Sequence, residues 1–228
     1  MRTGLLGGTF DPIHAGHLDV ARAARQALAL DEVRLLPAGV PSHRHDGPRA
    51  SGYHRFAMVA LAVLDQPGLV ASDVELRASV PSSTAATLDR MARLGHVPLQ
   101  LFFITGADAL AEIATWRDYP DLLDRAHFVA VSRPGCPVAT LRERLPALAP
   151  RMIDVHSEQD ETAASRDKPS IFLLDAVTKD VSSTAIRQRL ADGLSLAGLL
   201  PDLVERHIRH HHLYSPHAPA ADDLHGQD

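Results

Sequence analysis

The sequence contains very little cysteine and few aromatic residues. Cys136 is the single cysteine among 228 residues, and Phe, Tyr and Trp together make up 4% of the chain. One cysteine cannot form an internal disulfide, so nothing favours an oxidising compartment. The sequence also lacks an apolar run of about 18 residues, the length typical of a membrane-spanning helix, and its first residues show no secretory signal pattern. We therefore expect a cytoplasmic protein with no membrane partner.

The chain has no large excess of charge of either sign. Lys and Arg number 23 against 28 Asp and Glu, a net charge of −5, and this balance gives no general affinity for nucleic acid. The hydrophobic share of 45% is enough for a large buried core. No internal repeat or linker interrupts the pattern before the end. We expect one domain over residues 1–214 and a disordered tail over 215–228.

Histidine, in contrast, is abundant. The chain has 14 histidines, and five of them lie between His207 and His217. Two interpretations stay open for this group. It can be a solvated helix end and tail, or it can be a metal-binding cluster, although the run of three histidines lacks the partner spacing of a structural zinc site.

Strand-like and helix-like patterns alternate along the chain. Short apolar runs typical of strands occupy residues 2–7, 32–39, 68–75, 99–106, 126–135, 151–156 and 171–177. Helical spacing occupies residues 16–30, 51–67, 82–95, 182–193 and 201–214. The polar segment 157–170 is expected to be a surface insertion. This alternation predicts an α/β fold: a Rossmann-like, doubly wound parallel sheet with helices on both faces, in a single domain. Ligands bind such sheets at the carboxyl ends of the strands, where the strand order reverses.

The segment GGTFDPIHAGH, residues 7–17, joins the first predicted strand to the first predicted helix. Gly7 and Gly8 let the backbone approach an anion closely, and the following helix points free N–H groups and its positive dipole end at the same place. The segment is neither a dinucleotide fingerprint nor a P-loop. It nevertheless predicts a phosphate site.

His14 and His17 are three residues apart, which places them on one face of the first helical turn. The two imidazoles can donate hydrogen bonds to phosphate oxygens and, if protonated, add positive charge. A metal site is the rival interpretation, but Asp11 is the one carboxylate in the loop. We expect Asp11 to order the loop through hydrogen bonds to backbone groups.

A second phosphate motif is predicted near the C-terminus. Ser182, Ser183 and Thr184 open a helix, where hydroxyls and free N–H groups can face an anion, and Arg187 lies over the same turn. On its own the motif can be merely a well-capped helix. Together with the first motif it predicts two halves of a triphosphate clamp.

These motifs resemble those of the nucleotidyltransferase superfamily with the H-x-G-H signature, and more narrowly those of the bacterial nicotinate-nucleotide adenylyltransferases. The resemblance extends in order through the segments LLPAGVPSHR, SVPSSTAATL, FFITGADALAEIATWRDYPDL, FVAVSRPG, VSSTAIRQRL and LPDLVERHIRHHHLY, so it covers residues 1–214. The chain departs from the family pattern at Ser42, where the family has Pro, at Ser83, where it has an aromatic residue, and at His207, where it has Tyr. The insertion at 157–170 also departs from the common length.

The resemblance implies transfer of the adenylyl group of ATP to nicotinate mononucleotide, forming deamido-NAD and pyrophosphate in NAD biosynthesis. It implies catalytic roles for His14, His17 and Arg187, and acceptor binding by Arg44, Thr84 and Trp116. The residues expected to bind ATP are Gly7, Gly8, Thr9, Phe10, Gly106, Asp108, Arg133, Ser182, Ser183 and Thr184. Mg²⁺ is expected, held mainly through ATP phosphates and water rather than by protein ligands.

Two other functions stay open from the sequence. One is an adenylyltransferase for a different acceptor, such as nicotinamide mononucleotide or phosphopantetheine, although His14 and the Trp116 segment disfavour phosphopantetheine. The other is a non-catalytic nucleotide-binding regulator on the same fold. The sequence is also compatible with a homo-oligomer and does not decide the oligomeric state.

Overall fold

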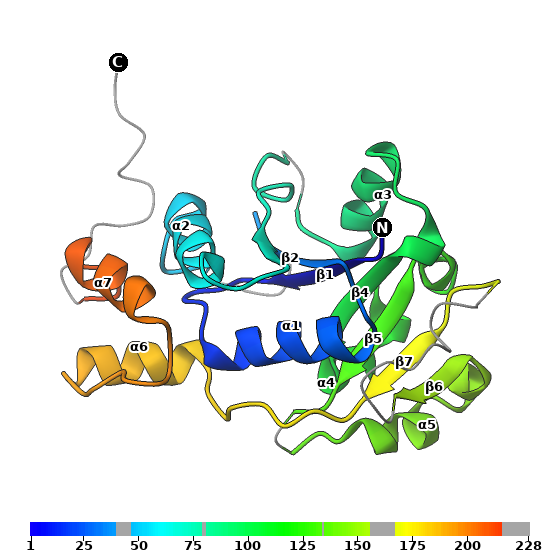
Figure 1. Ribbon diagram of the computed structural model, residues 1–228. Coiled ribbons are helices and arrows are strands. Elements are labelled where there is room, and N and C mark those ends of the chain that lie inside the picture. The colour runs from blue at the N-terminus through cyan, green and yellow to red at the C-terminus, as the bar shows by residue number, and fades with distance from the viewer. Residues whose placement is uncertain (40–46, 79–80, 134, 156–166, 216–228) are drawn as a thin grey trace.

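The structure is a computed structural model that describes residues 1–39, 47–78, 81–133, 135–155 and 167–215. Its centre is a seven-stranded sheet in the order β3-β2-β1-β4-β5-β7-β6, in which all six strand pairs are parallel. The strands are β1 (Thr3–Gly8), β2 (Glu32–Pro37), β3 (Leu69–Ala71), β4 (Leu101–Gly106), β5 (His127–Val131), β6 (Met152–Val155) and β7 (Ile171–Leu174) (Figure 1). This sheet confirms the predicted doubly wound α/β architecture.

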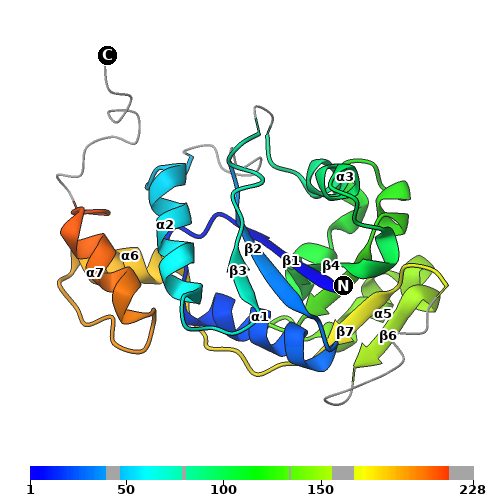
Figure 2. The ribbon, with the colours of Figure 1, turned by 45° about the horizontal axis from the view of Figure 1, so that its top comes forward.

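Helices cover both faces of the sheet and divide the core into two clusters. One cluster contains side chains of α1 (Ala15–Ala27), α2 (Gly52–Val63), α6 (Ser183–Ala191) and α7 (Asp202–His210). The other contains side chains of α3 (Thr84–Arg93), α4 (Ala107–Leu110) and α5 (Leu141–Arg144). Figures 1 and 2 show α2, α6 and α7 gathered on one side of the molecule, away from α3 and α5. Alternate residues of the central strands point into the two clusters, since side chains alternate across a strand.

Serine caps start three of the long helices. The hydroxyl oxygens of Ser51, Ser83 and Ser182 accept hydrogen bonds from backbone N–H groups in the first turns of α2, α3 and α6 at 3.3, 3.3 and 3.1 Å. Each cap satisfies an N–H that has no partner inside its helix. The sequence predicted the helix starts at Ser51 and Ser182 on these grounds.

Some predicted boundaries are wrong. The first helix ends at Ala27 rather than at residue 30, because Ala29 adopts a left-handed φ of 46° that a helix cannot continue through. The third strand keeps only Leu69–Ala71 of residues 68–75, since Asp73 and the residues after it form a turn. The last helix ends at His210 rather than at residue 214, and His212 and Tyr214 have positive φ.

The strand order reverses at β1. The chain adds β2 and β3 on one side of β1 and then crosses to β4 on the other side. The carboxyl ends of β1 and β4 are Gly8 and Gly106, so the predicted motifs meet at this crevice.

Two predicted features fall largely outside the described residues. The polar insertion is described only at its end, from residue 167, and the tail only at Ser215. The division into a domain over 1–214 and a disordered tail therefore stays a prediction. Within the described ranges, no helix is long and apolar enough to cross a membrane.

Candidate active site

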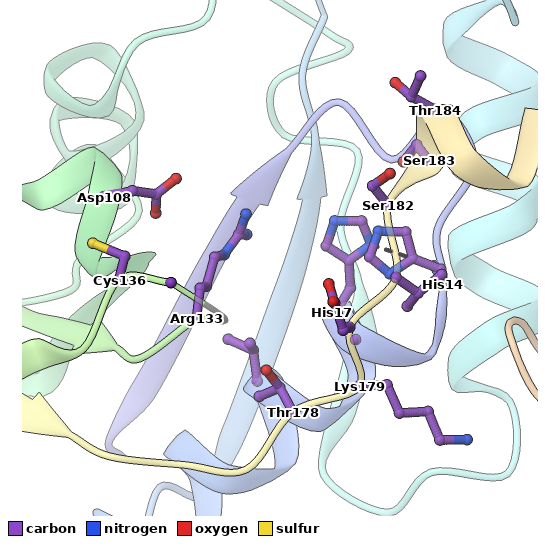
Figure 3. Close-up of a pocket in the computed structure, with 15 residues that line it drawn as sticks. His14, His17, Asp108, Arg133, Cys136, Thr178, Lys179, Ser182, Ser183 and Thr184 are labelled. Carbon is purple, nitrogen blue, oxygen red and sulfur yellow. Dashed lines mark hydrogen bonds between the residues drawn. The ribbon is translucent and has the colours of Figure 1, made fainter.

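A cavity of about 490 Å³ lies where the N-termini of α1 and α6 meet (Figure 3). His14, Gly16 and His17 line it from α1, and Ser182, Ser183 and Thr184 line it from α6. Val20 of α1 also lines it, and the other lining residues come from the β4 and β5 ends and from the segment before α6: Asp108, Arg133, Gly135, Cys136, Thr178, Lys179, Asp180 and Val181. The sequence thus predicted both helix starts that border the cavity.

The rings of His14 and His17 stack on each other at the N-terminus of α1. Their centroids lie 3.6 Å apart with an interplanar angle of 24°. The backbone N–H of His14 donates to Nδ1 of His17 at 3.3 Å. A neutral His17 ring that accepts at Nδ1 carries its proton on Nε2, which is then a hydrogen-bond donor.

Both imidazoles are held neutral by their surroundings. Burial and the nearby Arg133 lower the pKa of His14 to about 4, against a partial opposing effect of Asp19. Burial, His14 and Arg133 lower the pKa of His17 well below its ordinary value. In the free protein at neutral pH the pair can therefore donate hydrogen bonds but adds little positive charge.

Gly16 has a steric reason to be glycine. A Cβ at this position would lie 2.9 Å from the carbonyl oxygen of Lys179 and 3.3 Å from Nδ1 of His14. The absent side chain lets the segment that precedes α6 pass close to the start of α1. The middle glycine of the H-x-G-H signature therefore brings the two predicted phosphate motifs together.

The hydroxyls at the start of α6 are engaged within the protein. Ser182 caps the helix, Ser183 donates to the carbonyl oxygen of Pro12 at 2.9 Å, and Thr184 accepts from Arg187 at 3.1 Å. These contacts tie α6 to the loop before α1. The first-turn N–H groups and the positive end of the helix dipole remain as the anion-attracting features of this side.

Arg187 does not line the cavity. One of its nitrogens donates to the carbonyl oxygen of Asp11 at 2.6 Å, and the other donates to Thr184. The guanidinium therefore joins α6 to the loop before α1 next to the cavity, and its fork geometry lets it hold Thr184 of the same helix as well.

Asp11 is fully buried and orders its loop, as predicted. Its carboxylate accepts from the backbone N–H groups of Arg49 and Ala50 at 2.8 and 3.1 Å and from the hydroxyl of Tyr214 at 2.8 Å. Burial and the adjacent Asp11 raise the pKa of Tyr214 above its ordinary value, so this hydroxyl stays a donor. The loop is thereby joined to the start of α2 and to the residues after α7.

Gly106 ends β4 beneath two charged side chains. A Cβ there would collide with the carboxylate of Asp108 and lie 2.9 Å from the guanidinium of Arg133. Glycine thus leaves room for Asp108 and Arg133 to reach the cavity from the β4 and β5 side, opposite His17 (Figure 3).

Residues 7–10, at the end of β1 and directly after it, lie beside the cavity rather than in its lining. Phe10 is buried, has a φ of 49°, and packs edge-on against His17 with ring centroids 4.9 Å apart. A Cβ on Gly8 would lie 3.0 Å from the Phe10 ring, whereas one on Gly7 would meet only Phe103 at 4.0 Å. Gly7 is therefore the exposed glycine, and Gly8 makes room for the Phe10 ring that packs against His17. The Thr9 carbonyl accepts a hydrogen bond from the buried Arg55 at 2.8 Å.

The predicted acceptor residues are not brought together by this cavity. Thr84 is the first residue of α3, and Trp116 is half-buried with its ring edge-on to Phe103 at 6.0 Å. Neither lines the cavity. Arg44 lies outside the described residues.

Sequence reasoning missed the segment between β7 and α6. Thr178, Lys179 and Asp180 line the cavity from this extended stretch. Lys179 is anchored by its backbone N–H to Asp19 at 3.1 Å and by its ammonium to the carbonyl oxygen of Gly198 at 2.9 Å. A lysine three residues before the capping Ser182 was the available signal.

The comparisons with known proteins agree with this geometry. Residues 5–189 match the cytidylyltransferase-like family. A probable nicotinate-nucleotide adenylyltransferase of Desulfatibacillum aliphaticivorans is 39% identical over 222 residues, covering 94% of this chain and 100% of that protein. The chain belongs to the nicotinate-nucleotide adenylyltransferase family. A second relative with the same description, from Moorella thermoacetica, is 38% identical and covers 94% of this chain and 92% of its own.

Solved structures share the fold at low identity. The Plasmodium falciparum nicotinic acid mononucleotide adenylyltransferase complexed with NaAD has a TM-score of 0.66 at 18% identity, covering 93% of this chain and 97% of that chain. A putative nicotinate-nucleotide adenylyltransferase of Vibrio parahaemolyticus has a TM-score of 0.57 at 17% identity, covering 94% and 96%. At these identities the likeness supports the Rossmann-like fold alone.

Proposed function

We propose that this family member transfers the adenylyl group of ATP to nicotinate mononucleotide, releasing pyrophosphate and forming deamido-NAD. One observation carries the proposal beyond family membership. Two helix N-termini, two stacked neutral imidazoles and Arg133 converge on one cavity at the point where the strand order reverses. Such a convergence suits the triphosphate of ATP.

The attacking group needs no general base. The phosphate of nicotinate mononucleotide has a second pKa of about 6, so it is already an anionic nucleophile at neutral pH. The lowered pKa values of His14 and His17 would also make either ring a weak base. The protein's task is to align two polyanions and to stabilise charge on the departing pyrophosphate.

The proposed phosphate contacts come from both helix starts. His14 and His17 would donate from α1, the N–H groups near Ser183 and Thr184 would donate from α6, and Arg133 would supply positive charge from the β5 side. Arg187 would hold α6 against the loop before α1 and keep its guanidinium beside the reacting phosphates. Gly7 would admit the nucleotide close to the end of β1, with Gly8, Thr9 and Phe10 shaping that loop.

The rest of ATP and the acceptor would extend along the carboxyl edge of the sheet. Gly106 would let the adenosine approach, and Asp108 would accept hydrogen bonds from its ribose hydroxyls. Trp116 would stack on the pyridine ring, Thr84 would bind the nicotinate carboxylate at the start of α3, and Arg44 would bind the acceptor phosphate.

The cavity fits a magnesium ion carried in by the nucleotide. Its lining includes only two carboxylates, Asp108 and Asp180, and among the described residues no group of three potential ligands gathers there. Mg²⁺ keeps much of its water and is often held through substrate phosphates. When bound, it neutralises phosphate charge, while the chain's own residues position the substrates.

A direct assay separates this function from its alternatives. The protein is incubated with ATP and Mg²⁺ together with nicotinate mononucleotide, nicotinamide mononucleotide or phosphopantetheine, and released pyrophosphate and the dinucleotide product are measured. We expect the highest rate with nicotinate mononucleotide. A higher rate with either other acceptor would reassign the substrate, and ATP binding without turnover on any acceptor would identify a nucleotide-binding regulator instead.

Two properties stay predictions. We expect the enzyme to act in the cytoplasm, and a homo-oligomer remains compatible with the sequence. Size-exclusion chromatography with light scattering measures the oligomeric state directly.

A further inference from the structure

Three histidines meet on the outer side of the molecule, at the contact between α2 and α7. They are His54 of α2 and His207 and His211 at the end of α7. One ring nitrogen from each lies within 4.8 Å of the others, and Nδ1 of His54 is 3.1 Å from Nε2 of His207. None of the three lines the cavity between α1 and α6.

The helix geometry explains the cluster. His207 and His211 are four residues apart, so their side chains lie one above the other on a single helix face. Val204 and Ile208 are buried in the same core cluster as Met58 and Val59 of α2, which fixes the packing of the two helices. That packing places His54 opposite the two histidines of α7.

We propose that His54, His207 and His211 bind one divalent transition-metal ion of the Zn²⁺ class. Imidazole nitrogen is a preferred ligand for this class. A tetrahedral site with Zn–N bonds of about 2.0–2.1 Å places ligand atoms roughly 3.3 Å apart. Nδ1 of His54 and Nε2 of His207 are already near this spacing at 3.1 Å, and all three nitrogens lie within 4.8 Å of one another, so side-chain rotations that bring His211 closer complete the site. His54 and His207 are half-buried and His211 is exposed, which leaves a fourth position open to water.

The protonation state of the rings suits a cation. Nδ1 of His54 and Nε2 of His207 face each other at 3.1 Å, so at most one of these two nitrogens carries a proton. At least one lone pair in the cluster is therefore available to a metal without the release of a proton.

The position of the cluster gives the metal a structural role. The residues that follow α7 carry Tyr214, whose hydroxyl donates to the buried Asp11 of the loop before α1. A metal bound by both helices ties α7 to α2 and so stabilises this C-terminal connection. The site therefore acts on folding stability and is separate from adenylyl transfer.

The test uses the full chain freed of metal by chelation and then given ZnCl₂ alone. We expect one Zn²⁺ per chain by calorimetry and by metal analysis after desalting. At free zinc about 100 times Kd, binding to the native state should raise Tm by roughly 5–10 °C. The same concentration of MgCl₂ should give no rise, because Mg²⁺ prefers oxygen ligands.

Two ligand variants and one matched control decide the assignment. His207→Gln and His54→Gln should each weaken zinc binding by at least about tenfold, as loss of a ligand costs no less than loss of its supporting partners. His212→Asn removes a histidine of the same run outside the cluster and should bind zinc like the wild type. Unchanged binding in both ligand variants, or an equal loss in His212→Asn, would overturn the proposal. If one ligand variant fails to fold, the zinc affinity of the other alone decides the assignment.

Discussion

The two sides of the proposed active site differ in how completely the protein holds them in place. On the phosphate side, His17 accepts from the His14 backbone, Ser183 bonds to Pro12, and Arg187 bridges Asp11 and Thr184. On the acceptor side, Trp116 makes ring contacts at 6.0 and 6.3 Å with Phe103 and Phe128. Thr84 there follows a capping serine.

This difference has a physical basis. A triphosphate has the same charge and shape for every acceptor, so the groups that stabilise it gain from being fixed before the substrate arrives. An acceptor is recognised by its ring substituent, and a half-buried aromatic side chain can pack on other rings until a substrate replaces them. The comparison predicts that substitutions on the phosphate side lower the catalytic rate more than substitutions on the acceptor side.

His17→Ala should have the largest effect. Loss of one preorganised donor should lower kcat by about 10²–10³, while KM for the acceptor changes little. Steady-state kinetics of pyrophosphate release measure both constants, with His96→Ala as a histidine variant outside the cavity. A change in KM alone would mean that His17 serves binding and not the reaction.

Arg187→Lys should come next. The lysine cannot engage the Asp11 carbonyl and Thr184 together, and losing one charge-assisted hydrogen bond should lower kcat/KM by roughly 10- to 100-fold. Arg189→Lys on the same helix is the matched control, since the Arg189 guanidinium donates to the Ser195 carbonyl and does not line the cavity. A near-normal Arg187→Lys enzyme would show that charge alone matters at this position.

His14 should make the protein less stable in acid. Its pKa of about 4 in the folded state lies below its ordinary value of 6.5, so the unfolded chain binds more protons between these limits. The contribution of neutral His14 to the free energy of unfolding is therefore fully present above pH 6.5, and it is lost as the pH falls toward 4. Between pH 7.5 and pH 5 the loss is at most about 2 kcal/mol.

Urea unfolding at the two pH values measures this effect in the wild type and in His14→Asn. Asn is a favoured residue at the N-cap of a helix and does not titrate, so the stability of the variant should fall less between the two pH values. An equal loss of unfolding free energy in the two proteins would show that groups other than His14 cause the acid sensitivity.

The acceptor side should show the smallest effect. A helix N-terminus near Thr84 favours the carboxylate of nicotinate over the neutral amide, and we expect a preference of at least about tenfold in kcat/KM. Trp116→Ala should weaken both mononucleotides in parallel, because stacking does not distinguish their substituents. A changed ratio in Trp116→Ala would place discrimination at the ring, with Ser83 beside Thr84 as the next residue to vary.

The sequence could predict the features that depend on local patterns, but not those that depend on contacts between distant segments. The first helix follows from its apolar spacing and its motif, the helix at Ser182 follows from local capping, and the cavity lies where the two motifs meet. The role of Gly16 depends on the distant Lys179 carbonyl, and the position of Arg187 depends on the distant Asp11. No local pattern encodes such contacts between segments that lie far apart in the chain.

The histidine-rich end shows a second limit. Spacing within the run did not decide between a solvated helix and a metal cluster, because the partner, His54, comes from α2 and shares no motif with it. Likewise, Trp116 was expected to stack on a substrate ring, and its packing against Phe103 depends on the fold of β4 and the loop after it.

The central claim is that neutral imidazoles at the start of α1 donate to the reacting phosphates. It is tested most directly by NMR of protein labelled with ¹⁵N in its histidine rings, with His17 assigned through the His17→Ala variant. We predict that His17 in the free enzyme at pH 7 is neutral with its proton on Nε2, and that a non-hydrolysable ATP analogue with Mg²⁺ shifts the Nε2 resonance. A His17 imidazolium in the free enzyme, or an Nε2 signal unmoved by saturating analogue, would contradict the account.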